Sequence, residues 1–281
     1  MIGVIVINYG DPERTIRFVK EECARISSPH AVVVVDNGSG DEALAELETV
    51  LGGHVEIISA GENLGFAKAN NLGAEVAGQK FGADLLLFVN NDMVFTSPDV
   101  VDVLAERLAQ LPDVGMIGPK VRGLDGRLQS PEPYQSFADR HLLPYWGKLF
   151  MSKDRLASKL QEDYAETAEE GFHYRIMGSF ILMRTADFVE CGRMDPNTFL
   201  YAEEAILSER LKRIGKGVWY EPSVEVLHEH GATVNSHFNI VRRRRMRLES
   251  DSYYYRTYLH LSRLQYLAAR MTYALKALFG L

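Results

Sequence analysis

Several features are scarce or missing in this 281-residue sequence, and each absence excludes a class of protein. There are two cysteines, Cys23 and Cys191, which are too few for a disulfide framework or a cysteine-rich zinc site and are typical of a reducing compartment. No uncharged run approaches the roughly 20 apolar residues that span a bilayer. Acidic residues outnumber Lys and Arg by 38 to 31, a net charge of −7, which gives no sign of nucleic acid as a partner. What remains is a globular protein, and we expect it in the cytoplasm.

The glycine-rich loops that bind phosphate in common nucleotide-binding folds are also missing. After the first predicted strand, at residues 2–7, the turn reads NYGDP. This turn contains neither the G-x-G-x-x-G of dinucleotide-binding enzymes nor a P-loop. A nucleotidyltransferase, which would make a sugar nucleotide, normally carries a glycine- and arginine-rich loop at the same point. The sequence therefore disfavours all three kinds of nucleotide enzyme.

What the sequence does contain is a regular alternation of buried-strand and helix patterns. Helical segments separate apolar runs, and the first begins with Asp11 as N-cap and Pro12 at its first position and reaches to about residue 26. Such alternation predicts a parallel sheet of the α/β class. In the first half, runs rich in β-branched residues predict strands at 2–7, 31–35, 55–59 and 84–89. In the less regular second half, we expect a helix at 203–214 and strands at 114–117, 175–183, 218–220 and 224–227.

Polar residues follow three of the predicted strands, in the sequences NY, DN and NND. Ligands of such sheets bind beyond the carboxyl ends of the strands, so three clusters at one edge indicate one site. The carboxylate of Asp36 can accept the imide N–H of uracil or thymine, and Tyr9 can stack on that ring. Asp92 can hold a divalent cation against a diphosphate. Each residue alone could be a helix cap or a packed aromatic; together they predict a site for a nucleoside diphosphate.

Five ordered motifs lie between residues 2 and 233: VVDNGSGD at 34–41, NLGFAKANNLG at 63–73, FVNND at 88–92, FLYAEE at 199–204, and YEP at 220–222 with His228, Gly231 and Thr233. Together they resemble the motifs of the family 2 glycosyltransferases, with the bacterial rhamnosyltransferase-like branch as the nearest likeness. The resemblance implies the GT-A fold, a Rossmann-like mixed and mainly parallel sheet flanked by helices. It further implies a nucleotide-binding half at residues 1–119 and an acceptor-binding half at 120–240. The charge and spacing of residues 241–281 separately predict a basic amphipathic helical tail.

The resemblance also implies which residues bind the nucleotide. By position, Tyr9 and Asp36 would hold the base, and Asn63 and Gly65 would line the nucleoside. Asn90 stands at the first position of the D-x-D-like element of this family. It is Asn where the family pattern has Asp, so binding of the metal would depend on other groups.

The same resemblance assigns the metal and the catalytic base. Asp92 would bind Mg²⁺ or Mn²⁺, and His228 falls on a position that faces the metal or the diphosphate. Glu204 falls on the position of the base, where many members have Asp; a Glu can perform the same proton transfer with one methylene more of reach. Its neighbour Glu203 should point to a different face of the same helix, because the two carboxylates are adjacent at a helix start.

Together these features predict an inverting glycosyltransferase of cell-surface polysaccharide synthesis. The donor would be a dTDP- or UDP-sugar, with dTDP-rhamnose first, and the acceptor a hydroxyl of a glycan or lipid-linked glycan. The departures at Asn90 and Glu204 leave an alternative open: a catalytically silent protein of the same fold that binds sugar nucleotides or acts as a scaffold.

The C-terminal tail differs from the rest of the chain in its charge. From residue 242 onward, nine Lys and Arg residues stand against two acidic ones, a net of +7, so the preceding part carries −14. On one continuous helix, Arg256, His260, Arg263 and Arg270 would form a basic stripe beside an apolar stripe at 261–278. A basic amphipathic helix of this kind favours peripheral binding to the inner face of the plasma membrane. The alternative is a helix packed on the catalytic domain with its arginines exposed.

Overall fold

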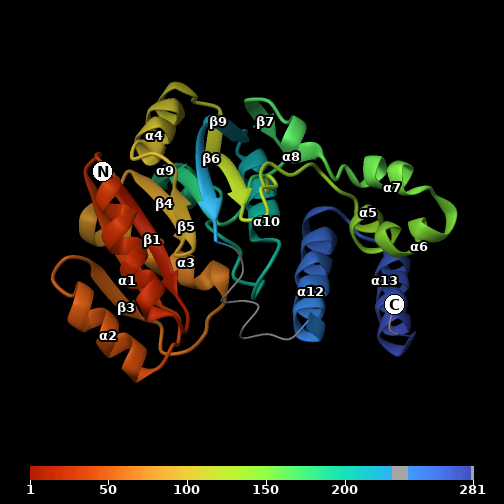
Figure 1. Cartoon of the computed structure of the whole chain (residues 1–281), viewed down its shortest axis with the longest axis horizontal. Coiled ribbons are helices and arrows are strands. Elements are labelled where there is room, and N and C mark those ends of the chain that lie inside the picture. The colour runs from red at the N-terminus through yellow and green to blue at the C-terminus, as the bar shows by residue number, and fades with distance from the viewer. Residues whose placement is uncertain (230–239, 280–281) are drawn as a thin grey trace.

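The computed structural model of the chain describes residues 1–229 and 240–279. Within them, one nine-stranded sheet has the strand order β3-β2-β1-β4-β8-β6-β9-β5, with β7 paired to β9 (Figure 1). The strands are β1 (Ile2–Asn8), β2 (His30–Asp36), β3 (Glu56–Ser59), β4 (Leu85–Asn90), β5 (Met93–Phe95), β6 (Val114–Gly123), β7 (Gly171–His173), β8 (Phe180–Arg184) and β9 (Gly217–His228). The helices are α1 (Pro12–Glu21), η1 (Cys23–Arg25), α2 (Asp41–Leu51), α3 (Phe66–Phe81), α4 (Val100–Gln110), α5 (Phe137–His141), α6 (Leu143–Phe150), α7 (Lys153–Leu160), α8 (Tyr164–Thr167), α9 (Thr185–Glu190), α10 (Glu203–Arg213), α12 (Ile240–Tyr258) and α13 (Arg263–Phe279).

The first half is the predicted parallel sheet, with β1 between β2 and β4. Alternate residues of β1 face opposite layers: Val4 and Val6 pack with α1, α2 and α4, whereas Ile5 packs with α3. Both faces of the strand are therefore covered, which is why its sequence is continuously apolar. The first helix is shorter than expected, because α1 ends at Glu21 and a 3₁₀ turn follows at Cys23–Arg25.

The second half extends the same sheet with mixed pairing, as the GT-A expectation requires. β8 lies antiparallel between β4 and β6, and β9 runs parallel to β6. The strands expected at 218–220 and 224–227 are one strand, β9, whose register against β6 shifts after Pro119 and leaves residues 222–224 bulged. The strand expected at 175–183 begins only at Phe180, because the backbone of Arg175 pairs with Glu132 outside the sheet.

The tail is helical, but the prediction of one continuous helix is wrong. α12 ends at Tyr258, His260 has a left-handed φ of +58°, and α13 starts at Arg263. The stripe from Arg256 to Arg270 therefore does not lie along a single helix. The side chains of residues 273–281 lie outside the described part of the chain. No helix among the described residues is long and apolar enough to cross a membrane.

One face of α12 packs on the second half of the chain, beside α5 and α10 (Figure 1). Tyr254 and Tyr255 are buried against Phe137. Asp195 accepts hydrogen bonds from the hydroxyls of Tyr253 and Tyr258 at 2.9 and 2.7 Å. On this face, α12 therefore packs against the rest of the chain, as the alternative prediction for the tail expected.

Candidate active site

The carboxyl ends of β1, β2 and β4 bring the predicted nucleotide-binding residues to one edge of the sheet. Asn8 and Asp36 are register partners at the ends of β1 and β2. The Asp36 carboxylate is 2% exposed and accepts a hydrogen bond from Asn8 Nδ2 at 2.8 Å and one from the Ser39 backbone N–H at 3.2 Å. Its position is therefore fixed before any ligand arrives, and each oxygen retains a further acceptor site. Tyr9 follows directly and is half-buried.

A second turn at this edge is built around Asn63. Its side-chain oxygen accepts hydrogen bonds from Asn37 Nδ2 at 3.2 Å and from the Gly65 N–H at 2.9 Å. Gly65 has a φ of +81°, and a Cβ there would lie 2.4 Å from the Phe199 carbonyl oxygen. That oxygen accepts a hydrogen bond from the N–H of Phe66 at 2.9 Å. Gly65 therefore lets the nucleotide-side turn dock on the segment that leads into α10.

Asp92 and His228 meet where β4 and β9 end, with 3.4 Å between Asp92 Oδ2 and His228 Nε2. Burial raises the pKa of Asp92, but the hydrogen bond and charge of His228, with the charge of Arg14, lower this pKa below its ordinary value. Asp92 Oδ1 is buried and has no hydrogen-bond partner among the described residues. A buried, unpaired carboxylate oxygen beside an imidazole nitrogen fits a divalent cation.

The other nitrogen of His228 is also placed. Nδ1 lies 2.7 Å from Gln129 Oε1, so Nδ1–H donates to Gln129 and Nε2 faces Asp92. Outer partners of this kind orient metal-binding histidines. The described residues contain no cluster of three or more potential metal ligands. A cation here would therefore complete its shell with the donor diphosphate and water. Gly231 and Thr233 of the same motif lie outside the described residues.

The predicted base lies at the start of α10, beside the loop whose Ser179 carbonyl accepts a hydrogen bond from the Asn90 N–H at 3.0 Å. The Glu204 side chain is 18% exposed, and its Oε1 lies 3.5 Å from Arg175 Nη1. A Cβ on Gly178 would lie 3.4 Å from Glu204 Oε2, so this carboxylate faces the loop between Arg175 and β8. Tyr201 and Ala202 precede the helix with φ of +78° and +68°. Two consecutive left-handed non-glycine residues cost about 1–3 kcal/mol each, a strain typical of functional sites.

Glu203 has a different environment, as its adjacent position suggests. It is 5% exposed, and its Oε1 has no hydrogen-bond partner in the part of the chain that the structure describes. Burial, followed by the negative charge of Glu204, raises the pKa of Glu203 to about 8. At neutral pH, Glu203 is therefore mostly protonated.

This pKa predicts a pH-dependent stability. The native state binds the Glu203 proton more tightly than the unfolded state, so the free energy of unfolding should fall as pH rises from about 4.5 to about 8. Glu203→Gln should remove a slope of up to about 1.4 kcal/mol per pH unit. Urea unfolding at pH 5, 6.5 and 8 measures it. The exposed Glu190→Gln should keep the wild-type slope, and an unchanged slope in Glu203→Gln would contradict the prediction.

Two side chains that support the site escaped the sequence prediction. Arg175, which is 4% exposed, forms ion pairs with Glu132 and Glu204. Arg175 could have been found from its position, because it is a charged residue at the start of an apolar run and a buried charge needs a partner. The role of Gln129 could not be predicted from the sequence, because Gln129 and the residue it contacts, His228, are 99 residues apart.

Comparison with known proteins agrees with this geometry. Residues 3–183 match the family model described as "Glycosyl transferase family 2". The chain belongs to glycosyl transferase family 2. It is a glycosyltransferase, and the resemblance inferred from its motifs is confirmed.

Relatives of this glycosyltransferase include an N-acetylglucosaminyl-diphospho-decaprenol L-rhamnosyltransferase of Mycobacterium tuberculosis. The two are 26% identical over 239 residues, 81% of this chain and 76% of the relative. The O-antigen biosynthesis protein RfbC of Myxococcus xanthus is 23% identical over 83% of this chain and 17% of its own length. The mannosyltransferase PcManGT of Pyrobaculum calidifontis, solved with GDP-Man and Mn²⁺, has a TM-score of 0.60 at 16% identity and covers 100% of this chain and 76% of its own. This likeness shows the GT-A fold.

Proposed function

We propose that this glycosyltransferase transfers a sugar, with inversion, from a dTDP- or UDP-sugar to a hydroxyl of a lipid-linked glycan in cell-surface polysaccharide synthesis. The observation that carries the proposal is the position of Glu204. Its carboxylate faces Gly178, and the carbonyl of the next residue, Ser179, accepts a hydrogen bond from the N–H of Asn90, two residues before Asp92. The named activity of the Mycobacterium tuberculosis relative supports dTDP-rhamnose as the first donor to test and a lipid-diphosphate glycan as the acceptor.

The donor would bind along the sheet edge. Tyr9 would stack on the base and Asp36 would accept its imide N–H, while Asn63, Gly65 and Asn90 would line the nucleoside and diphosphate. The fixed orientation of Asp36 supports this role, because its bonds to Asn8 and Ser39 hold the carboxylate in place.

Asp92 and His228 would hold Mg²⁺ or Mn²⁺, which supplies stabilisation of the negative charge on the departing diphosphate. The deprotonated Asp92 fits this role, because its lowered pKa keeps the carboxylate ionised at neutral pH. The charge of Arg14 lies close enough to Asp92 to contribute to that lowered pKa, so it adds positive charge beside the diphosphate.

Glu204 would act as the base. Its carboxylate takes the proton of the acceptor hydroxyl while that oxygen forms a bond to the anomeric carbon from the face opposite the nucleotide. The bond from the anomeric carbon to the diphosphate oxygen breaks, and its electron pair leaves with the nucleoside diphosphate. Arg175 positions the base through its contact at 3.5 Å.

A screen of dTDP- and UDP-sugars tests the proposal. Each donor is incubated with Mn²⁺ or Mg²⁺, and sugar hydrolysis is measured together with thermal stabilisation of the protein. We expect one donor to be turned over in a metal-dependent way. Stabilisation by nucleoside diphosphates without turnover of any donor would favour the catalytically silent alternative that Asn90 and Glu204 leave open.

We further propose peripheral association with the inner face of the plasma membrane, through α6 and α13 rather than through a single tail helix. Trp146 of α6 donates a hydrogen bond to Thr272 of α13 at 2.9 Å, so the two helices adjoin. We call their exposed apolar residues the α6–α13 patch; these are Trp146, Leu149, Phe150, Leu264, Leu267 and Met271. Lys148, Arg263 and Arg270 are exposed on the same helices and supply positive charge. An apolar patch with Trp and basic residues suits the headgroup region of an anionic membrane.

Sedimentation with vesicles tests the α6–α13 patch. The wild-type protein should pellet with phosphatidylglycerol vesicles at low salt and less at high salt, because the arginine and lysine contribution is screened. Phe150→Ser should reduce pelleting, whereas Leu124→Ser, an equally polar change at an exposed leucine after β6, should not. Equal partition onto neutral and anionic vesicles, or none onto either, would contradict the proposal.

A further inference from the structure

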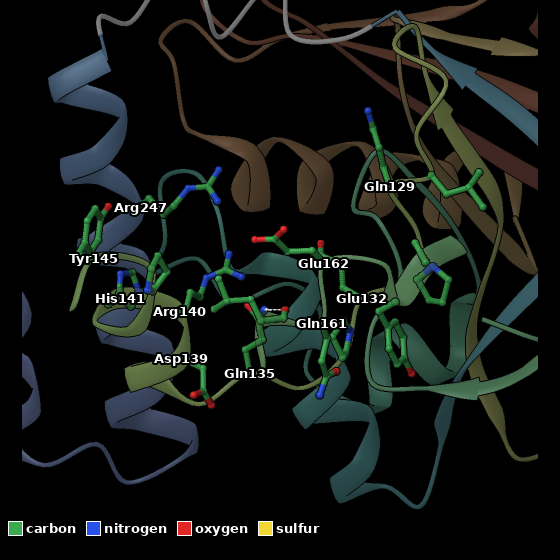
Figure 2. A pocket seen from close by; sticks show the side chains of 17 residues that line it. Gln129, Glu132, Gln135, Asp139, Arg140, His141, Tyr145, Gln161, Glu162 and Arg247 are labelled. Atoms are coloured by element: carbon green, nitrogen blue, oxygen red, sulfur yellow. Dashed lines mark hydrogen bonds between the residues drawn. The ribbon is translucent and has the colours of Figure 1, made fainter. Parts of the chain in front are cut away.

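A cavity of about 430 Å³ lies in the acceptor half, between the segment at 128–135, helices α5 to α8 and α12 (Figure 2). Figure 2 shows Gln129 and Glu132 on one side of it and Arg140 and Arg247 on the other. The cavity therefore joins the loops beside the active site to the helical group that carries the tail.

One side of the cavity lies close to the candidate active site. Gln129 contacts His228, the proposed metal ligand. Glu132 forms an ion pair with Arg175, and Arg175 contacts Glu204. A molecule in this cavity would therefore reach toward the catalytic base.

The other side presents two guanidinium groups. Arg140 uses Nε to bind Asp251 at 2.8 Å, and its two terminal nitrogens have no hydrogen-bond partner among the described residues. Arg247 stacks 4.4 Å from the centre of the Tyr201 ring and forms no ion pair within the described part of the chain. Figure 2 shows both groups directed into the cavity, with the exposed Glu162 facing them from across it.

We propose that Arg140 and Arg247 bind the phosphate groups of a lipid-diphosphate-linked acceptor, whose sugar then points toward Glu204. Planar guanidinium groups with free donors match phosphate oxygens. The inference rests on the proposed function and deepens it by placing the acceptor.

Helix α6 gives the lipid a route out of the cavity. Pro144 and Tyr145, in its first turn, line the cavity. The remainder of the helix carries Trp146, Leu149 and Phe150 of the α6–α13 patch. A prenyl chain attached to the bound diphosphate would thus leave along an apolar surface.

Farnesyl diphosphate, without divalent metal, is the probe, and its affinity is measured by calorimetry. Arg247→Gln should weaken binding by about tenfold or more, the loss expected for a charge-assisted bond to phosphate. The position is exposed, so the change should not affect folding. Arg140→Gln should weaken binding as well. Arg256→Gln, an exposed arginine on the same helix but outside the cavity, is the matched control and should change affinity less than twofold.

The outcomes separate the two proposals. Unchanged affinity for farnesyl diphosphate in Arg247→Gln and Arg140→Gln would overturn the phosphate subsite. Equally tight binding of pyrophosphate and farnesyl diphosphate would also overturn it, because the site would then be one for free phosphate. Nucleoside diphosphate affinity with Mn²⁺ should be unaffected in Arg247→Gln. If no dTDP- or UDP-sugar is turned over but farnesyl diphosphate binds through Arg247, the subsite stands and the proposed donor falls.

Discussion

Glu204→Gln should reduce sugar transfer by about 10²–10⁴-fold, the usual contribution of a positioned base, while nucleoside diphosphate affinity stays close to that of the wild type. The substitution keeps the size of the side chain and its place beside Arg175 but removes the group that takes the proton. Steady-state transfer rates and calorimetric titration with the nucleoside diphosphate measure the two effects.

Glu203→Gln is the matched control for this experiment. It makes the same change one residue earlier, at a carboxyl that is already mostly protonated at neutral pH because burial raises its pKa to about 8. Transfer by Glu203→Gln should therefore remain near the wild-type rate. Loss of activity in Glu203→Gln, with near-normal transfer by Glu204→Gln, would move the base to Glu203.

Asp92→Ala should abolish the metal dependence of donor binding. Removing one outer-shell partner of a metal costs about 10–100-fold, and loss of a direct ligand should cost at least as much. The fold should survive, because Asp92 stands after the end of β4 and its side chain contacts His228 of the candidate site.

Titration of nucleoside diphosphate with Mn²⁺ and with a chelator measures this effect. In the wild type, the chelator should weaken binding; in Asp92→Ala, affinity should be equally low in both conditions. Asp99→Ala, at an exposed carboxylate of the next helix start, should behave as the wild type does. Unchanged metal dependence in Asp92→Ala would place the cation elsewhere.

The edge of the sheet that holds the candidate site could be predicted because it follows from local patterns. Runs such as 2–7 and 84–89 are β-branched and apolar, so their ends are visible in the sequence, and parallel strands place their ends together. Asp36 and Asp92 are thereby brought to one edge without knowledge of any long-range contact. The Glu203–Glu204 pair was visible for the same reason, as two carboxylates at a helix start.

The acceptor side could not be predicted in this way. Arg175 lies outside the expected strand because it pairs with Glu132, 43 residues earlier. A contact between residues so far apart leaves no periodic pattern in the local sequence. The docking of α12 depends in part on the hydroxyls of Tyr253 and Tyr258, which bind Asp195, 58 and 63 residues away. Periodicity describes which face of an element is buried, but it does not say which distant charge a buried arginine meets.

The contact between Gly65 and Phe199 has a consequence for the binding of the two substrates. The turn that would line the nucleoside is bonded, through Phe66, to a carbonyl five residues before Glu204, and two strained residues lie between them. Any movement of that turn on binding of the donor is passed to the backbone that positions the base. The two substrates would then not bind independently, and because such coupling is reciprocal, each would change the affinity for the other by the same factor.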